Sequence, residues 1–242
     1  MSTTSRRIVA EMRRAADPER ARLAARFFKT GPGEYGEGDA FLGLTMPQVR
    51  ATLKAHPDLT PAACVELLAS KWHEVRALAV LGLARLAKRG DPRSRLAVRR
   101  IYLRNAGRID NWDLVDISAP DVVGRSVLER RDLEVLEKLA RSKSLWQRRI
   151  AIVSTFAHLR TGDVEPTLRI AEIVVDDRHD LMHKACGWLL REVGKRDAAA
   201  LDAFLERHAA TMPRTALRYA VERMSPNRRR EWMAVKAASR RR

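Results

Sequence analysis

The segment Trp72-His73-Glu74-Val75-Arg76-Ala77-Leu78-Ala79 opens the stretch that decides the fold. Apolar side chains recur there at intervals of three and four, at Val75, Leu78, Ala79, Leu81, Leu83 and Leu86. This period is that of one face of an α-helix, so we expect a helix over residues 73–88. Ala, Leu, Arg, Glu and Lys dominate the rest of the chain, and no alternating segment is long enough to predict a strand. The sequence therefore predicts an all-α fold.

The same patterns, with Gly, Pro and Asp as punctuation, predict the other helices. We place them near residues 5–15, 18–28, 47–55, 60–69, 93–106, 111–118, 120–128, 131–141, 145–159, 164–175, 179–194, 197–209, 213–224 and 227–239.

Three of the expected helices share a beginning and an end. They open at Trp72, Leu145 and Asp180, and the turns after them reach Asp91, Asp163 and Asp197, which lie 72 and 34 residues apart. A unit of about 35 to 40 residues built from two helices indicates a HEAT-like α-solenoid. We expect one domain over residues 1–242. It would comprise N-terminal helices and a connector (1–45), repeats (46–226) and a basic C-terminal helix and tail (227–242).

The charge of the chain restricts its partners. Lys and Arg number 47 against 30 acids, which gives a formal net charge of +17 and indicates a polyanion, either nucleic acid or an anionic membrane surface. The sequence contains no apolar run long enough to span a bilayer and no apolar secretory segment near its start. Cys64 and Cys186 stand alone in apolar contexts, so we expect reduced cysteines and a cytoplasmic protein. The histidines form no HExxH motif, and we expect neither metal nor cofactor.

Basic residues recur near the start of the inner helices, at Arg76, Arg149, Lys184 and Arg214. Stacked repeats would align them as a positive stripe on the concave face. The alternative is that each base simply faces water.

Residues 29–44 hold five of the 12 glycines of the chain. No strand precedes this segment, no Gly-Lys-Ser/Thr follows it, and Glu34, Glu37 and Asp39 would repel phosphate. We interpret it as a connector, not as a phosphate-binding loop.

Asp110-Asn111-Trp112-Asp113-Leu114-Val115-Asp116 is the segment richest in chemistry. Spacing of i and i+4 puts Trp112 and Asp116 on one helical face, with Asp110 as the expected cap. Asp116 lies beyond the first turn, so capping does not explain it. Its carboxylate either contacts a ligand or forms a structural ion pair with an arginine. Trp112 and Trp188, each beside a charge, either belong to the core or wall an aromatic cleft.

Three motifs together resemble the AlkD-like DNA alkylation-repair glycosylases, in order over essentially the whole chain. They are Asn111-Trp112-Asp113-Leu114-Val115-Asp116, Trp146-Gln147-Arg148-Arg149-Ile150-Ala151-Ile152 and Lys184-Ala185-Cys186-Gly187-Trp188-Leu189-Leu190-Arg191-Glu192. The resemblance implies a right-handed stack of HEAT-like helix pairs that clasps duplex DNA in a concave groove. It also implies excision of cationic purines such as 3-methyladenine and 7-methylguanine.

By the same resemblance, Asp116 is the catalytic carboxylate, and Trp112 and Trp188 flank the deoxyribose of the lesion. Phe27 stands where the family has a tyrosine, which keeps an aromatic surface without the hydroxyl. Arg149 and Arg191 hold backbone phosphates. We count Arg148 and the stripe residues Arg76, Lys184 and Arg214 among the expected phosphate contacts.

Three functions remain open from the sequence. The first is a monofunctional alkylpurine DNA glycosylase, expected to act as a monomer because it would clasp the duplex asymmetrically. The second is a non-catalytic HEAT-repeat module that binds DNA or RNA structures through the same stripe. A protein-binding solenoid with an acidic partner is a third, weaker reading.

Overall fold

The computed structural model describes residues 1–235, and the tail arginines Arg240, Arg241 and Arg242 lie outside the described residues. Its contacts group into two compact units, Met1–Val122 and the chain from Val123 onward. Within residues 1–235 the regular structure is helical apart from one isolated bridge between Ala40 and Trp72. The expected all-α class, built of consecutive helix pairs, is confirmed. The single domain, the handedness and the concave groove stay predictions.

The first unit contains seven α-helices and a short 3-10 turn. Their bounds are α1 Thr3–Arg14, α2 Pro18–Phe27, α3 Met46–Ala55, α4 Pro61–Leu68, α5 His73–Arg89, α6 Pro92–Arg104, η1 Ala106–Arg108 and α7 Trp112–Asp116.

A π-helical turn, η2 Pro120–Gly124, leads into the second unit. The helices there are α8 Arg125–Arg130, α9 Glu134–Ala140, α10 Leu145–Ser154, α11 Phe156–Leu159, α12 Glu165–Val174, α13 Asp180–Gly194, α14 Ala198–His208, α15 Arg214–Ala220 and α16 Pro226–Ala234.

Four helices begin in the same way, with a short polar side chain followed by proline. Asp17, Thr60, Asp91 and Ser225 each accept a backbone N–H of the following turn, and a proline occupies the first helical position. The cap satisfies a free N–H group, and proline loses nothing where no intrahelical bond is made. These local signals explain why the expected helix starts lie close to the observed ones.

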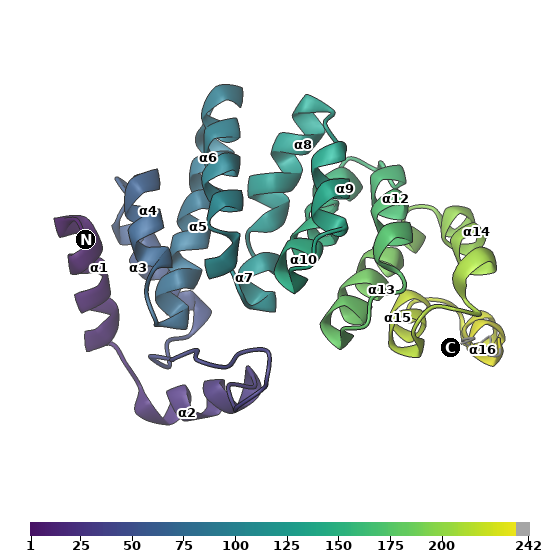
Figure 1. Cartoon of the computed structure of the whole chain (residues 1–242), viewed down its shortest axis with the longest axis horizontal. Helices are drawn as coiled ribbons and strands as arrows, with labels where there is room; N and C mark the ends of the chain where they lie inside the picture. Colours follow the sequence, from purple (N-terminus) through teal and green to yellow (C-terminus); the bar gives the residue numbers. More distant parts are fainter. Residues whose placement is uncertain (236–242) are drawn as a thin grey trace. The chain divides into compact units, whose positions relative to one another are not determined.

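Helix α5 is the centre of the first unit. It packs against α3, α4 and α6, with α1 beyond α3 and α4 (Figure 1). Most of its residues are buried, among them Val75, Leu78 and Leu83. The apolar period that opened the sequence analysis therefore belongs to a helix surrounded by others.

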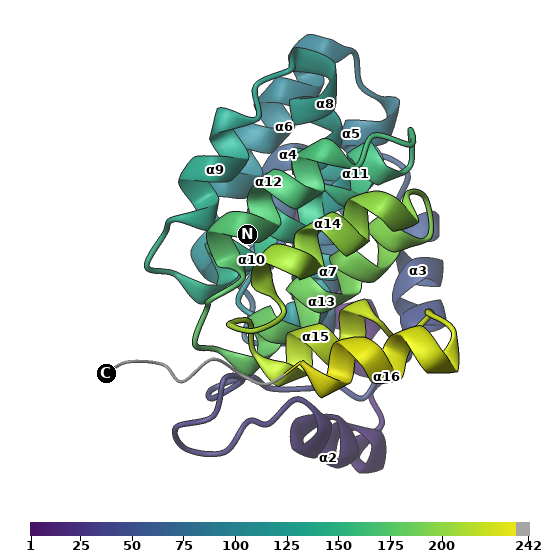
Figure 2. The same cartoon turned by 90° about the vertical axis from the view of Figure 1, so that its right-hand side faces the viewer.

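Helix α13 plays the same part in the second unit. It packs against α10, α12, α14 and α15, and α15 packs against α16 (Figure 2). Gly187 permits a close approach to α15, because a Cβ there would lie 2.4 Å from the carbonyl oxygen of Ala216. The two helices meet almost backbone to backbone.

The helix expected over 145–159 is interrupted, and this prediction was wrong in that respect. The chain forms α10 to Ser154 and resumes as α11 at Phe156. The Thr155 hydroxyl donates to the carbonyl of Ile152 at 2.7 Å, a local bond of the kind that bends helices.

The connector between α2 and α3 is irregular, as expected, and is fixed by a buried carboxylate. Glu74, near the start of α5, accepts the backbone N–H groups of Leu42 at 2.9 Å, Gly43 at 2.8 Å and Leu44 at 3.2 Å. Gly43 has φ +80°, and a Cβ there would lie 2.1 Å from the carbonyl oxygen of Asp17. Both the backbone conformation and the lack of space require glycine at this position.

Helix α2 differs from the other helices of its unit because none of its residues is buried. Leu23 and Phe27 on this helix are 58% and 65% exposed. Its start is tied to the connector, because the backbone N–H of Asp17 donates to the carbonyl of Leu42 at 2.8 Å.

Candidate functional site

Helix α7 carries Trp112 at its first residue and Asp116 at its last, and both are partly exposed. The cap is Asn111, whose side chain accepts the N–H of Trp112 at 2.8 Å, so our assignment of the cap to Asp110 was wrong. The pKa of the neighbouring Tyr102 hydroxyl is raised by burial and, to a smaller extent, by the charge of Asp116. Asp116 therefore lies at the end of a short helix, beside a buried phenol.

The indole of Trp112 is held by aromatic rings from the end of α2. Its centroid lies 5.5 Å from that of Phe28 in a stacked arrangement with an interplanar angle of 25°. Phe27 approaches edge-on at 6.0 Å. Phe27 and Trp112, which the sequence placed in one site, are thus in contact although 85 residues separate them.

Beneath these rings lies a buried histidine. The imidazole of His73 contacts both Phe28 and Phe41, at centroid distances of 4.8 and 4.7 Å, and these two phenylalanine rings also stack on each other at 5.1 Å. Its Nδ1 lies 3.0 Å from a carboxylate oxygen of Asp39, and its Nε2 lies 2.8 Å from one of Asp113. The ring thus bridges the connector and α7 through hydrogen bonds at both nitrogens.

This arrangement keeps His73 charged. Burial would lower its pKa, but the hydrogen bonds and charges of Asp113 and Asp39 outweigh burial and raise the pKa to about 9. At neutral pH both nitrogens therefore donate, and the face of Phe41, which stacks on the ring, attracts its positive charge. We call His73, Asp39, Asp113 and Arg76 the buried ionic cluster.

Arg76 belongs to this cluster and not to an exposed stripe. Its side chain is 7% exposed, forms an ion pair with Asp39 and lies 3.4 Å from Asp110. Asn111 donates to Asp39 at 3.0 Å. Burial would raise the pKa of Asp39, but the His73 hydrogen bond, the charge of Arg76 and the Asn111 hydrogen bond lower it overall. The guanidinium of Arg76 is thus buried and paired with Asp39, and its expected contact with a phosphate stays a prediction.

The second unit contains the other expected aromatic residue, Trp188, on α13. Its ring lies 5.7 Å from that of Phe156. One turn later on the same helix, the side chain of Arg191 is 20% exposed and forms an ion pair with Glu222. Trp112 and Trp188 belong to different units, and the cleft that we expect them to wall stays a prediction.

The remaining expected phosphate contacts differ in exposure. Arg148 binds Asp177 at 2.5 Å and the carbonyls of Ser142 and Lys143. Arg149 is buried and donates to the carbonyl of Leu181 at 2.6 Å.

Two basic residues of the second unit extend toward solvent instead. Lys184 is 42% exposed and pairs with Asp180 at 2.7 Å. Arg214 is exposed and donates to the carbonyl of Val235 at 3.1 Å. Lys184 and Arg214 are thus the most accessible of the expected phosphate contacts of this unit.

Sequence reasoning missed Phe28, Phe41 and His73. Phe28 directly precedes the glycine-rich connector, Phe41 lies within it, and His73 has no metal-ligand spacing, so no local signal marks the three residues. Among residues 1–235, no helix is both long enough and apolar enough to span a bilayer.

Comparison with known proteins adds a family. The model of the DNA alkylation repair enzyme family matches residues 8–224. A solved structure described as a predicted DNA alkylation repair enzyme from Enterococcus faecalis has a TM-score of 0.68 and 16% sequence identity. That match covers 87% of this chain and 97% of the other. The search of curated proteins finds no match. Since the family model spans most of the sequence, the chain belongs to the DNA alkylation repair enzyme family.

Proposed function

We propose that the protein is a monofunctional DNA glycosylase that hydrolyses the N-glycosidic bond of cationic N3- and N7-alkylated purines in duplex DNA. The observation that carries this proposal is the pair on α7. Trp112 and Asp116 stand one helical turn apart, both partly exposed, and the Trp112 indole is backed by Phe28. We further propose that the protein acts as a monomer in the cytoplasm.

Hydrolysis of this glycosidic bond requires mainly a carboxylate that is held close to the sugar. N-alkylation makes the purine a cation, so the base leaves as a neutral molecule when its bond to C1′ breaks and no general acid is needed. Positive charge then grows on the sugar. A carboxylate at Asp116 would stabilise that charge and orient a water, whose oxygen bonds to C1′ while its proton passes to solvent or to the carboxylate.

The aromatic rings would add to this stabilisation. The faces of Trp112 and Trp188 would attract the cationic sugar by about 0.5 to 2 kcal/mol each, more as water is excluded. Phe27, exposed beside Trp112, extends the same surface. Its contact would be apolar, because phenylalanine offers no hydroxyl.

Basic side chains of the second unit would supply the affinity for the backbone. Arg214 is exposed and Lys184 and Arg191 are partly exposed, and binding through these three would depend steeply on salt and little on base sequence. Arg148 and Arg149 donate to Asp177 and to the carbonyl of Leu181, and either would exchange these partners to bind a phosphate.

The test is release of methylated purines from alkylated duplex DNA by the full chain and by Asp116→Asn. We expect the variant to lose activity by about 100-fold or more, because charge stabilisation is the main contribution. It should still bind DNA. Asp176→Asn, which removes an exposed acid of the second unit, is the matched control and should excise normally.

Two outcomes would contradict the proposal. Equal excision by Asp116→Asn and the wild type would remove the catalytic assignment. Salt-sensitive DNA binding without release of any alkylated base by the wild type would instead favour the non-catalytic binding module.

A further inference from the structure

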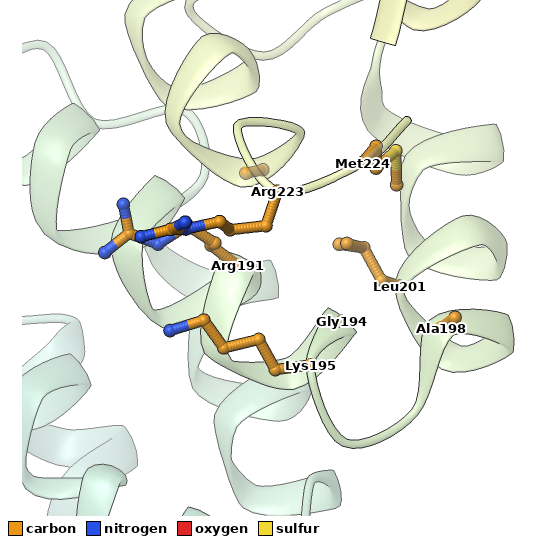
Figure 3. A pocket seen from close by; sticks show the side chains of 8 residues that line it. Arg191, Gly194, Lys195, Ala198, Leu201, Arg223 and Met224 are labelled. Carbon is orange, nitrogen blue, oxygen red and sulfur yellow. The ribbon is translucent and has the colours of Figure 1, made fainter. Parts of the chain in front are cut away.

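A small slot lies near the C-terminal end of α13, within the second unit (Figure 3). It has a volume of about 170 Å³ and is formed by α13, the start of α14 and the end of α15 with the turn that follows. Its lining divides by chemistry. Ala198, Leu201, Ala220 and Met224 are apolar, and we call them the floor; Arg191, Lys195 and Arg223 are cationic, and we call them the rim.

The floor is open because residue 194 is glycine. A Cβ there would lie 2.4 Å from the Leu201 side chain, so a larger residue would crowd the space between α13 and α14. Leu201 and Ala220 are buried, whereas Ala198 at the first position of α14 is exposed. The slot is therefore apolar at its base and accessible at one side.

The rim has more positive charge than its neighbours neutralise. Arg191 pairs with Glu222, and Lys195 pairs with Glu192 at 2.5 Å. Within residues 1–235, Arg223 has no carboxylate partner. An anion is thus favoured at the mouth.

A second, more open hollow adjoins the first and shares Arg191. Its volume is about 480 Å³, and Arg218, Tyr219, Glu222 and Arg229 complete its lining. In the part of the chain that the structure describes, Arg218 and Arg229 lack carboxylate partners as well. The two hollows together offer positions for more than one anionic group, on either side of Arg191.

Size and charge together define the ligand. An apolar cavity of about 150 Å³ accommodates a benzene ring, whereas sites for larger ligands measure about 300 Å³ or more. The slot thus fits one flat ring system and leaves any phosphate outside. A cationic ring, such as an alkylated purine, would be repelled by the three cations of the rim. The slot is accordingly unsuited to the lesion itself.

We propose that this slot holds the uncharged base of an unpaired nucleotide in DNA, with the phosphate of that nucleotide on Arg191, Lys195 and Arg223. The next phosphate of the same strand would lie over Arg218 and Arg229. Arginine planes at the rim can also stack on an unstacked base. The proposal deepens the proposed function, since it rests on DNA as the substrate, but it assigns a task that does not involve Asp116.

The test compares two duplexes, one fully paired and one with a single bulged adenine, by fluorescence anisotropy with the full chain. We expect the wild type to bind the bulged duplex about tenfold more tightly, as stacking on one base typically allows. Ala198→Phe would fill the slot and abolish this preference. Ala199→Phe, an exposed neighbour that does not line the slot, should retain it.

Further measurements separate the slot from the catalytic proposal. Ala198→Phe should release methylated purines from paired DNA at the wild-type rate. Arg223→Gln should weaken binding of the bulged duplex, and the number of counterions released on binding should fall by about one. Equal affinity of the wild type for both duplexes, or a preference that survives in Ala198→Phe, would overturn the proposal. So would competition by free dAMP without any preference for the bulge, because the slot would then serve a free nucleotide.

Discussion

Asp113 accepts a hydrogen bond from His73 at 2.8 Å, and this bond joins α7, which carries Trp112 and Asp116, to α5 at the centre of the first unit. His73→Gln removes the cation while keeping one donor. It leaves Asp39 and Asp113 close together with less compensation, so we expect a loss of about 3 kcal/mol in the free energy of unfolding. Urea denaturation measures it. A loss below about 0.5 kcal/mol would contradict a structural role for the charge.

The charge of His73 also predicts how stability changes with pH. Its pKa is about 9 in the folded protein and 6.5 in its unperturbed state. The stabilisation is therefore fully present below pH 6.5 and is lost as pH rises through 9, by about 3 kcal/mol. Urea denaturation between pH 6.5 and 9.5 should show this decline in the wild type and a smaller one in His73→Gln. An identical decline in both proteins would assign the effect to another group.

Gly43 tests whether the connector is as tightly fixed as its contacts indicate. Gly43→Ala introduces a Cβ 2.1 Å from the carbonyl oxygen of Asp17 at a φ of +80°. We expect destabilisation of about 3 kcal/mol or more, since both strain and a clash must be relieved. Gly33→Ala is the matched control, with φ +76° but nothing within 4 Å, and should cost about 1 kcal/mol. Thermal unfolding of the two variants gives the comparison, and equal losses would refute the close approach.

The adjacent phenylalanines at the end of α2 should separate function from stability. Phe27 is 65% exposed, so Phe27→Ala should change the free energy of unfolding by less than about 0.5 kcal/mol. It should nevertheless weaken binding of alkylated DNA, if that surface meets the substrate as proposed. Phe28→Ala should destabilise the protein by about 2 kcal/mol, because its ring stacks on Trp112, Phe41 and His73. Parallel measurements of unfolding and DNA affinity test both expectations.

Much of the helical fold was predictable because its signals are local. The apolar period of α5 and the polar-proline starts of α2, α4, α6 and α16 act within a few residues, and the observed bounds lie close to those expected. The break at Thr155 was missed, since the apolar pattern continues through it while a single hydroxyl redirects the backbone.

The environment of the site was less predictable. Asp39 and Asp113 lie 34 and 40 residues from His73, in segments without a periodic pattern, so neither could be assigned to it from spacing. Arg76 shares its helical position with exposed bases elsewhere, but the connector folds over it and supplies Asp39. Trp112 and Asp116 were recognisable because a single short helix sets their spacing.

No residue of α2 is buried, and only Ala21, Ala24 and Ala25 are partly covered. Substitutions along its outer surface should therefore leave the stability of the protein almost unchanged, and its amides should exchange with deuterium before those of α5. The exposed residues of this helix can therefore change in evolution to suit a binding partner, because packing in the core does not restrict them.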